Sequence, residues 1–432
     1  MVIAARINLW KALVGAVLWD PKREIAVLEF DPAFVKSGMD LAPLRMPLAA
    51  LRDGQRIFSF PGLSKVTYRG LPGLVADSLP DRFGSDLLNA WLAAQGRNPD
   101  SVNPIERLCY TGRRGMGALE YEPANHPADA DTSSPLDIRE LVKLARQVLA
   151  KRGKLKANLG KKGADGLLNI IKVGASAGGA RAKAIIAYNE KTGAVRSGQV
   201  EAPRGFSHWL IKFDGVTNRK LGDPAGFGRI EFAYHRMAAA SGIAMTPCRV
   251  HEENGRAHFM TRRFDREGNE KVHMQTLCAL AHFDFNESNA YSYEQAFQVM
   301  RQLRLPFPDA EQLYARMVFN VVAGNQDDHT KNISFLMDKA GNWALSPAYD
   351  LTNANDPKSK WVHRHQMSVN GKREKITRND LVKVAKEMNI KSHREIIGRV
   401  VEAVSNWARH AKEAGVPKNQ AEAIRKDFLL KI

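Results

Sequence analysis

The chain has 432 residues, 44 % of them hydrophobic, which is ordinary for a folded protein with two or three cores. Its three cysteines, Cys109, Cys248 and Cys278, are far apart and form no CxxC pair, which argues against a disulfide framework and favours a reducing compartment. The net charge of +18 favours polyanionic partners such as nucleic acid, acidic proteins or nucleotides, although a solvated face that only maintains solubility has the same composition.

The N-terminal part, to about residue 125, is expected to be rich in β-strands with helical inserts such as residues 80–95. Residues 12–19 and 24–30 are β-rich stretches on either side of a turn that contains Pro21, which predicts a hairpin. The first stretch follows Lys11 and is too short to cross a bilayer, and no other stretch is long and apolar enough. We therefore expect a soluble, cytoplasmic protein without a signal peptide.

The middle of the chain begins after a low-complexity boundary at residues 123–135 and continues with an amphipathic helix. One face of this helix carries the apolar residues Ile138, Leu141, Val142, Ala145, Val148 and Leu149. The densest basic cluster comes next and consists of Lys151, Arg152, Lys154, Lys156, Lys161 and Lys162. Short strands, a Gly-rich loop at 174–184, a strand at 208–213 and a helix at about 229–240 are expected after it.

From about residue 273 the chain is predicted to be mostly helical, with one interruption by loops and strands at residues 324–351. The C-terminal residues from Ser392 onward are predicted to form two helices separated by residues 415–417. The predicted order of elements is strands with one helix, followed by helices with one embedded hairpin. A two-lobed kinase has the same order. The sequence therefore predicts an α+β, protein-kinase-like fold with a helical C-terminal lobe.

The most informative segment, residues 324–336, reads GNQDDHTKNISFL and follows a helix expected to start near Asp309. Within it, Asn332 lies five positions after Asp327. Strands at 333–337 and 343–346 are expected to form a hairpin, and Asp350 follows that hairpin directly. The spacing D-x-x-x-x-N alone occurs by chance in many proteins, but its combination with a preceding helix and a following hairpin is much rarer.

This combination has the residue types that phosphoryl transfer requires. One carboxylate must orient the attacking hydroxyl and accept its proton, while a second carboxylate and an amide oxygen hold Mg²⁺ against the phosphates. We therefore assign Asp327 as the catalytic carboxylate and Asn332 and Asp350 as metal ligands. Asp328 is one step out of register for the catalytic role.

A kinase also needs a strand lysine that holds the α- and β-phosphates and a glutamate on the next helix that orients it. Lys212 in strand 208–213 and Glu231, which is expected to open the following helix, are the candidates. A solvated edge lysine and a glutamate that suits the helix dipole are the alternatives. The small residues of the upstream loop, GASAGGARAKA, would let backbone N–H groups approach an anion, although a plain turn has a similar composition.

Together these segments resemble the HipA family of bacterial serine/threonine-protein kinase toxins, which act in type II toxin–antitoxin systems. The resemblance covers nearly the whole chain and rests on residues 176–183, 263–266, 327–332, 345–351 and 365–372. It implies an additional β-rich N-terminal subdomain at residues 1–125. It also implies a kinase-like N-lobe at 126–264, with the Gly-rich loop and phosphate-binding lysine, and a helical C-lobe at 265–432 with the catalytic loop.

The resemblance also implies individual roles. Asp327 matches the catalytic base, Asn332 and Asp350 match the magnesium site, and Lys212 matches the phosphate-binding lysine. The other residues of the implied ATP site are Ala177, Gly178, Gly179, Ala180, Arg181, Lys183, Arg262, Arg263, Phe264, His329 and Tyr349. Ser176 matches a serine that family members autophosphorylate, and a phosphate there would compete with ATP and silence the enzyme. The plain alternative for Ser176 is a small loop residue.

The family further implies ATP and Mg²⁺ as cofactors, transfer of the γ-phosphate to serine or threonine, and pairing with a small helix-turn-helix antitoxin. Aminoacyl-tRNA synthetases are the best-known class of protein substrate in the family. The sequence contains no evident DNA-recognition helix, so contact with operator DNA is expected through the antitoxin or through phosphates alone. No membrane partner is expected.

Two other interpretations remain open at this level. The spacing Asp327-x-His329-x-x-Asn332 also resembles the loops of aminoglycoside-type and phosphoinositide-type kinases, so a small-molecule or lipid kinase is the first alternative. A non-catalytic nucleic-acid-binding module with a decayed kinase fold is the second. It would explain the charge but would leave the catalytic residue types in place by accident.

Overall fold

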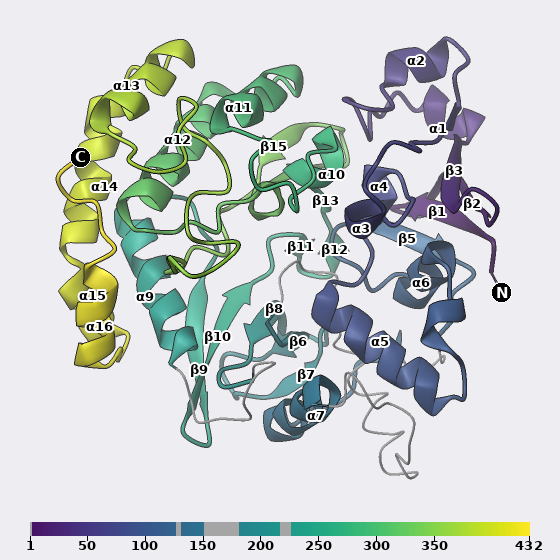
Figure 1. Cartoon of the computed structure of the whole chain (residues 1–432). Helices are drawn as coiled ribbons and strands as arrows, with labels where there is room; N and C mark the ends of the chain where they lie inside the picture. The colour runs from purple at the N-terminus through teal and green to yellow at the C-terminus, as the bar shows by residue number, and fades with distance from the viewer. Residues whose placement is uncertain (1, 127–130, 151–180, 217–225) are drawn as a thin grey trace. The chain divides into compact units, whose positions relative to one another are not determined.

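A computed structural model describes residues 2–126, 131–150, 181–216 and 226–432 of the chain. The contacts divide the chain into two compact units. Unit 1 comprises Met1–Ala225, His251–Met274 and Lys339–Gly341, and unit 2 comprises Gly226–Val250, Gln275–Asp338 and Asn342–Ile432. Figure 1 labels the helices and strands of both units. The basic cluster at residues 151–162 lies outside the described residues.

Unit 1 contains a five-stranded antiparallel sheet in the order β4-β3-β2-β1-β5. Its strands are β1 (Ala4–Leu9), β2 (Ala12–Asp20), β3 (Ile25–Phe30), β4 (Ile57–Phe58) and β5 (Leu119–Glu122). The predicted hairpin is confirmed, because β2 and β3 pair in register from Gly15 opposite Phe30 to Asp20 opposite Ile25. A Cβ at Gly15 would lie 2.0 Å from the carbonyl oxygen of Glu29, so the close pairing requires glycine there.

Several helices accompany this sheet: α1 (Pro32–Lys36), α2 (Leu48–Arg52), α3 (Lys65–Tyr68), α4 (Gly73–Ala76), α5 (Arg82–Ala94) and α6 (Pro104–Thr111). The helix expected at residues 80–95 is α5, which starts after Asp81. The Asp81 carboxylate accepts a hydrogen bond of 2.6 Å from the Gly84 N–H and so caps the helix. The buried side of α5 carries Phe83, Leu87 and Ala90 into the neighbouring core.

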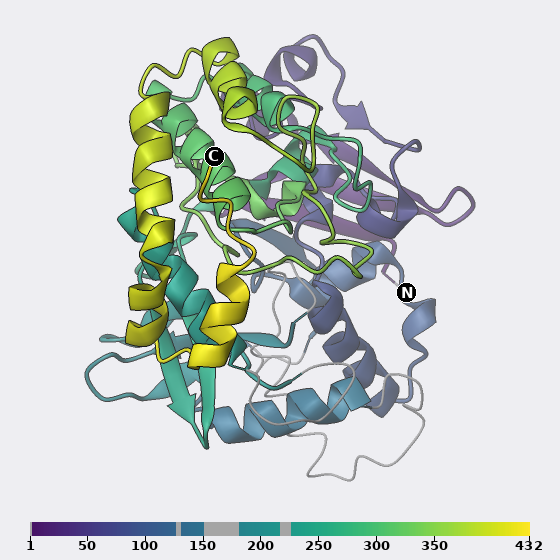
Figure 2. The same ribbon diagram turned by 60° about the vertical axis from the view of Figure 1, so that its left-hand side comes forward.

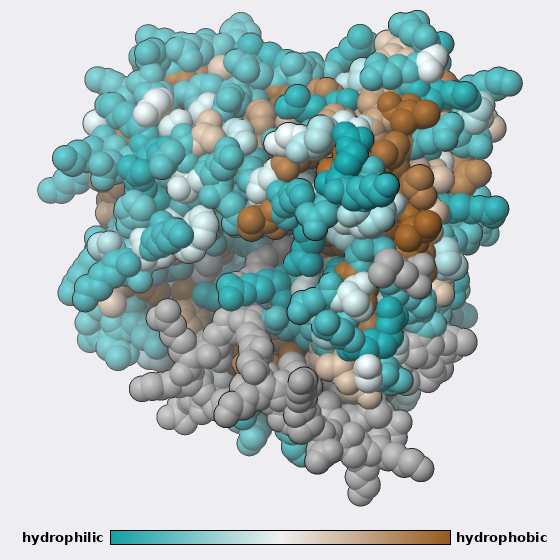
Figure 3. Space-filling model, turned by 45° about the vertical axis from the view of Figure 1, so that its right-hand side comes forward, coloured by the Kyte–Doolittle hydropathy of each residue, from teal (hydrophilic) through white to brown (hydrophobic). Residues whose placement is uncertain are grey.

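The outward face of the N-terminal sheet retains apolar side chains. Leu18 in β2 and Ile57 in β4 are 50 % and 59 % exposed. Leu18 lies opposite Ala4 on one side and Val27 on the other, so these three share a face. Brown apolar residues accordingly interrupt the mostly hydrophilic surface in Figure 3.

A second five-stranded sheet has the order β7-β6-β8-β10-β9. Its strands are β6 (Lys183–Tyr188), β7 (Val195–Ser197), β8 (Ser207–Lys212), β9 (Cys248–Glu253) and β10 (Arg256–Arg262). Helix α7 (Ile138–Ala150) packs its predicted apolar face into the core of this sheet, where its partners include Trp209, Ile211 and Phe213. The 3.6-residue period of the sequence therefore identified both the helix and its buried side. The strand expected at 208–213 is β8.

Residues 263–266, one of the segments that carry the family resemblance, form a buried ionic joint within unit 1. The Asp265 carboxylate is fully buried and accepts hydrogen bonds from Arg263 Nε at 2.8 Å, Arg263 Nη2 at 2.7 Å and Arg266 Nη1 at 2.9 Å. It also accepts a bond of 2.7 Å from the Gly117 N–H. Arg266 donates in addition to the carbonyl oxygens of Gly115 and Gly117. The motif thus ties the turn before β5 to the segment after β10.

The electrostatics of this joint favour ionised Asp265. Burial alone would raise the pKa of its carboxyl group, but the adjacent Arg263 and Arg266 charges hold that pKa below its usual range. After the joint the chain forms the short hairpin β11 (Arg266–Glu267) and β12 (Glu270–Lys271). Lys271 Nζ donates to Glu120 Oε1 at 2.7 Å, so the hairpin is tied to strand β5 as well.

Unit 2 is mainly helical. Its helices are α9 (Phe227–Ala240), α10 (Leu277–Ala281), α11 (Tyr293–Gln302), α12 (Phe307–Val322), α13 (Arg378–Glu387), α14 (His393–Ser405), α15 (Trp407–Glu413) and α16 (Lys418–Arg425). Helix α14 packs against α12 and α9, and α15 packs against α9, with the C-terminal helices in yellow in Figure 2. Every residue of α12 from Leu313 to Val322 is buried, so this helix is the central element of the unit.

The hairpin expected before Asp350 is confirmed. Strand β14 (Ser334–Met337) pairs antiparallel with β15 (Trp343–Leu345), and the two continue into a three-stranded sheet with β13 (His273–Thr276). The turn between them is closed by Asp338, whose N–H donates to the Asn342 carbonyl oxygen at 3.1 Å and whose carboxylate accepts from the Asn342 N–H at 2.9 Å.

Three expectations for the helical part need correction. The irregular stretch does not end at residue 351 but continues to Thr377, the N-cap of α13. The residues from Ser392 onward form three helices, because a break at Asn406 separates α14 from α15, in addition to the predicted break at residues 415–417. Glu231 does not open its helix, since α9 begins at Phe227. No helix in the described ranges has the length and apolarity needed to cross a membrane.

Candidate active site

The loop at residues 323–332 leaves the buried helix α12 and is anchored at both ends. Gly324 has a φ of +66°, in the left-handed region, which lets the chain turn sharply after the helix. Asn325 is buried and donates from its N–H to the Asn320 carbonyl oxygen at 3.0 Å and from Nδ2 to Asn320 Oδ1 at 2.9 Å. At the other end Thr330 Oγ1 donates to the Phe283 carbonyl oxygen at 2.7 Å. The loop is therefore held in one conformation between two helical segments.

Asp327 and Asn332 are joined across this loop. Asn332 Nδ2 donates to the Asp327 carbonyl oxygen at 2.7 Å. The bond uses the amide nitrogen of Asn332 and leaves its Oδ1 available for another partner. The Asp327 side chain is 46 % exposed, and its Oδ1 lies 3.8 Å from His329 Nε2. Asp327 thus offers a carboxylate to solvent from a backbone that its own loop holds in place.

Asp350 stands at the end of the segment that follows β15. Its φ of +53° places a non-glycine residue in the left-handed region, which costs about 1–3 kcal/mol. The preceding Tyr349 is anchored, because its hydroxyl donates to the Lys331 carbonyl oxygen at 2.6 Å and contacts Ser334 Oγ. A strained residue held by such an anchor is a feature that functional sites share.

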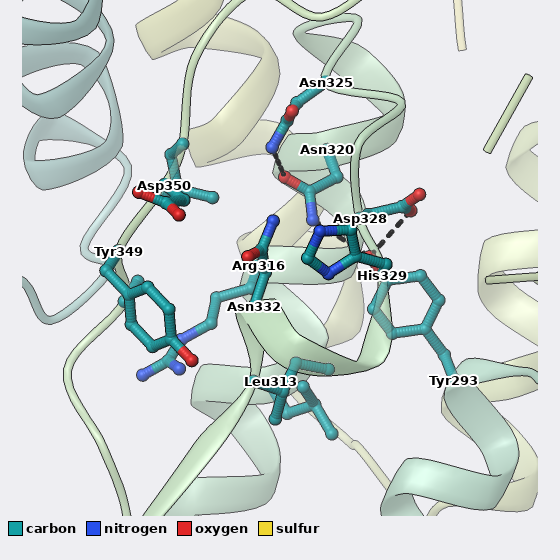
Figure 4. Close-up of a pocket in the computed structure, with 13 residues that line it drawn as sticks. Tyr293, Leu313, Arg316, Asn320, Asn325, Asp328, His329, Asn332, Tyr349 and Asp350 are labelled. Carbon is teal, nitrogen blue, oxygen red and sulfur yellow. Dashed lines mark hydrogen bonds between the residues drawn. The ribbon is translucent and has the colours of Figure 1, made fainter. Parts of the chain in front are cut away.

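Asn332 and Asp350 line one pocket in unit 2, of about 350 Å³ including its open mouth, together with His329 and Tyr349 (Figure 4). An amide oxygen and a carboxylate are hard oxygen ligands, and Mg²⁺ is commonly held by one or two such groups while water and phosphate complete its shell. No cluster of three His, Cys, Asp or Glu side chains suited to a metal occurs among the residues described. Asn332 and Asp350 thus supply the donor types that could hold Mg²⁺ together with a phosphate ligand.

The same pocket contains a cation that the sequence did not single out. Arg316, on α12, is 5 % exposed and lines the pocket below Asn332. Its Nη2 donates to the Ser346 carbonyl oxygen, and burial lowers the pKa of its guanidinium to about 10. A buried positive charge adds to the anion-attracting character of the pocket.

In unit 1 the predicted phosphate-binding lysine, Lys212, and Lys183, another residue of the predicted ATP site, are direct cross-strand neighbours. Lys183 in β6 lies opposite Lys212 in β8, so their side chains share one face of the sheet. Lys183 is 2 % exposed, and its Nζ lies 3.0 Å from Asp81 Oδ2. Lys212 is partly exposed, with its Nζ 5.6 Å from the centre of the Phe259 ring. Lys183 is thus paired with Asp81, and Lys212 is the more exposed of the two lysines.

Comparison with known proteins identifies the family. Residues 5–122 match the family model of the HipA N-terminal domain, and residues 175–424 match that of the HipA-like C-terminal domain. The chain belongs to the HipA family. The resemblance expected from the sequence motifs is thereby confirmed.

Two relatives illustrate how far the similarity extends. The HipA chain from a complex of HipA, HipB and operator DNA of Shewanella oneidensis MR-1 has a TM-score of 0.68 at 16 % identity, and the match covers 98 % of this chain and 94 % of that one. It shows a common fold, so the expected mixed architecture with a β-rich N-terminal region and a helical C-terminal part is confirmed. A protein of Sinorhizobium fredii named as a kinase, Y4mE, is 30 % identical over 126 residues. This stretch covers 27 % of the present chain and 30 % of that relative.

The remaining predicted site residues of this HipA-family chain differ in burial and in bonding partners. The Arg263 guanidinium is engaged by Asp265, so its side chain has a structural partner, while Arg262 at the end of β10 is exposed. Glu231 is buried in the second turn of α9, in unit 2, whereas Lys212 belongs to unit 1. Arg181 is partly exposed just before β6. The loop residues Ser176, Ala177, Gly178, Gly179 and Ala180 lie outside the described residues.

The sequence reasoning missed the residues that support the catalytic loop. Asp328 was judged only as a competitor of Asp327, yet its side chain is buried and hydrogen-bonded to Tyr293 and His365. His365 opens one of the segments that carry the family resemblance, which was a usable signal. Without the fold nothing in the sequence places residue 365 beside residue 328.

Proposed function

We propose that this HipA-family chain is an ATP-dependent serine/threonine-protein kinase that transfers the γ-phosphate of ATP to a protein hydroxyl. The observation that carries the proposal is the arrangement of Asn332, which bonds the Asp327 backbone and lines the same pocket as Asp350. One exposed carboxylate on a fixed loop beside two oxygen ligands is the minimum that phosphoryl transfer requires. Membership of the HipA family and the kinase relative support the same activity.

In this proposal each residue has one task. Asp327 accepts the proton of the attacking serine or threonine hydroxyl and orients its oxygen toward the γ-phosphorus. Asn332 Oδ1 and the Asp350 carboxylate would hold Mg²⁺, which when bound would supply charge neutralisation for the phosphates. Lys212 is the proposed lysine for the α- and β-phosphates. The loop at 177–183, the segment at 262–264, His329 and Tyr349 line the rest of the nucleotide site.

We further propose that the protein is the toxin of a toxin–antitoxin pair. The Shewanella HipA chain of the same fold was solved with HipB and operator DNA, which supports a small helix-turn-helix antitoxin and contact with DNA through it. Autophosphorylation of Ser176 would place a charge of about −1.5 to −2 in the anion-binding loop and inactivate the enzyme. An aminoacyl-tRNA synthetase is the proposed class of target.

The decisive experiment supplies the full chain with Mg²⁺ and ATP labelled on the γ-phosphate, in the presence of a cell lysate. Label on serine or threonine of a protein is expected, with phosphoserine at position 176 found by mass spectrometry. Label confined to small metabolites would establish the small-molecule kinase instead. No transfer at all by well-folded protein that binds ATP would establish the non-catalytic alternative.

Replacing the proposed base separates chemistry from binding. Asp327→Asn is expected to lower the transfer rate by about 10²–10⁴-fold, the usual contribution of a general base. Binding of a fluorescent ATP analogue should persist, because the side chain of Asp327 is exposed and its backbone contact to Asn332 survives. Asp356→Asn, which alters an exposed acid outside the pocket, is the control and should retain the wild-type rate. An active Asp327→Asn enzyme would remove the assignment of the base.

The metal assignment has its own test. Asp350→Asn is expected to raise the Mg²⁺ concentration needed for half-maximal transfer by about tenfold or more, since a neutral amide binds a hard cation less well than a carboxylate. The measurement is the transfer rate as a function of Mg²⁺ at fixed ATP. An unchanged Mg²⁺ dependence would show that Asp350 is not a ligand.

A further inference from the structure

The residue next to the proposed base has an environment of its own. Asp328 is 3 % exposed, and both of its carboxylate oxygens are occupied. Oδ2 accepts from the Tyr293 hydroxyl at 2.9 Å and lies 2.9 Å from His365 Nδ1, while Oδ1 accepts from the Gln366 N–H at 2.7 Å. Because a carboxylate accepts hydrogen bonds, His365 Nδ1 carries the hydrogen in this contact. Asp328 lines the same pocket as Asn332 and Asp350, and the bonds to both of its oxygens give it a fixed orientation.

These bonds join three separate segments of unit 2. Tyr293 is the first residue of α11, and its hydroxyl also accepts from Asn320 Nδ2 at 2.9 Å. Asn320 belongs to α12 and accepts from Asn325 Nδ2 at the start of the catalytic loop. The labelled side chains of Figure 4 show Tyr293, Asn320 and Asp328 grouped on one side of the pocket. The loop is thus bonded to α12 at Asn325 and to α11 at Asp328.

The third segment, residues 365–373, is itself rigidly attached to α11. The Ser368 N–H donates to the Tyr291 carbonyl oxygen at 3.1 Å, and the Tyr293 N–H donates to the Ser368 carbonyl oxygen at 3.0 Å. The His365 N–H donates to the Arg373 carbonyl oxygen at 3.0 Å. His365 is 5 % exposed. The contact between His365 and Asp328 therefore connects the loop to a fixed support.

We propose that Asp328 and His365 form a positioning pair that sets the direction of the Asp327 carboxylate. Asp327 is held on one side by Asn332, which bonds its carbonyl oxygen, and on the other by the side chain of its neighbour Asp328. Two clamps on adjacent residues leave the exposed Asp327 side chain little backbone motion. Displacement of a reacting group by about 1 Å costs roughly 100-fold in rate, so this rigidity has a direct effect on transfer.

The proposal rests on the kinase activity proposed above and predicts a separation of rate from affinity. Asp328→Asn keeps the shape but presents an amide where Tyr293 and His365 need an acceptor. It is expected to lower the transfer rate from ATP labelled on the γ-phosphate by about 100-fold. Affinity for a fluorescent ATP analogue should stay within about twofold of wild type, because both oxygens of Asp328 are already bonded to protein groups. A general loss of folding would reduce both together.

Partner variants make the test specific. His365→Leu removes the donor and should reproduce the loss of rate, whereas His365→Asn retains a donor near the Nδ1 position and should restore most of it. Tyr293→Phe removes one further bond to Asp328 and should lower the rate by a smaller factor. These variants decide the question if Asp328→Asn fails to fold.

A matched control distinguishes positioning from stability. Glu106, in α6 of unit 1, is 2 % exposed and accepts hydrogen bonds from Arg97 Nη2 at 2.7 Å and from Asn125 Nδ2 at 3.2 Å. Glu106→Gln should lower the melting temperature as Asp328→Asn does but retain the wild-type transfer rate. Wild-type rates in folded Asp328→Asn and His365→Leu enzymes would overturn the positioning role. Absence of transfer by the wild-type enzyme would instead overturn the proposed kinase activity.

Discussion

At the residue scale, the three cysteines have unequal environments although none forms a disulfide. Cys109 and Cys278 are fully buried, whereas Cys248 is partly exposed near the start of β9. Burial raises the pKa of the Cys109 thiol to about 12, with the Glu106 charge as a second cause. Because the thiolate is the reactive form, Cys109 is protected both by its pKa and by the core around it.

We predict that native protein reacts rapidly with a thiol reagent at one position only. Cys248 should be modified within minutes at pH 8, and the other two cysteines should react only after denaturation. The number of reactive thiols is measured from the chromophore that the reagent releases, with and without guanidinium. Cys248→Ser is the control and should abolish the rapid phase. Two or three fast thiols in the native protein would contradict the burial of Cys109 and Cys278.

Asp327, Asn332 and Asp350 could be identified as candidates from the sequence. Asn332 follows Asp327 by five positions, and Asp350 follows a predictable hairpin. The roles of Asp328 and His365 could not be predicted from the sequence. Their contact joins positions 37 residues apart through the irregular stretch after β15, which has no period to interpret. The spacing of residues in a sequence can indicate side chains that contact a ligand. Side chains that only hold other side chains in position can be recognised once the fold is known.

At the element scale, the joint of residues 263–266 is expected to be a major source of stability in unit 1. Asp265 is the common partner of two buried arginines and of the Gly117 N–H. Removal of one partner from a buried ion network leaves uncompensated charge and typically costs about 3–5 kcal/mol. The segment thus has a structural role that its place among the family motifs does not reveal.

We therefore predict that Asp265→Asn lowers the free energy of unfolding of unit 1 by about 3 kcal/mol or more. Chemical denaturation followed by tryptophan fluorescence is the measurement. Glu270→Gln is the control, because its ion pair with Lys339 is exposed on both sides and should leave the midpoint unchanged. A midpoint for Asp265→Asn equal to wild type would show that the joint is dispensable.

Periodicity predicted the regular elements well and their ends less well. The six apolar positions of α7 were recognisable because the pattern repeats over more than two turns, and the hairpin of β2 and β3 was recognisable from β-rich residues on either side of the turn at Pro21. The break at Asn406 was missed because apolar residues continue on both sides of it, with Val404 and Trp407 both buried. A change in helix direction without glycine or proline has little signature in the sequence.

At the scale of the whole molecule, three histidines, of which His258 and His273 are fully buried and His235 is partly buried, link stability to pH. Burial lowers the pKa of His235 and of His258 to about 4 and that of His273 to about 3. These side chains are neutral in the folded protein between pH 4 and 6.5, whereas the unfolded chain protonates them near pH 6.5. The unfolded state then binds more protons, so stability falls as the pH is lowered through this window.

We predict a melting temperature that is nearly constant above pH 7.5 and falls steadily from pH 6.5 to pH 4.5. Each of these histidines contributes at most about 1.4 kcal/mol per pH unit to the pH dependence of the unfolding free energy. His235→Leu should make this dependence shallower, while His363→Gln, at an exposed site, should not change it. A melting temperature that is the same at pH 7.5 and pH 5 would contradict the assigned neutral histidines.

The division into two units has a practical consequence for dissecting the protein. The chain passes from one unit to the other at residues 225/226, 250/251, 274/275, 338/339 and 341/342. No single cut can yield either half intact, and a fragment that ends at residue 122, where the first family match ends, would lack the Asp265 carboxylate that binds Gly117. Gene fragmentation, split-protein complementation and swaps of halves between relatives should therefore fail where whole-chain exchange succeeds.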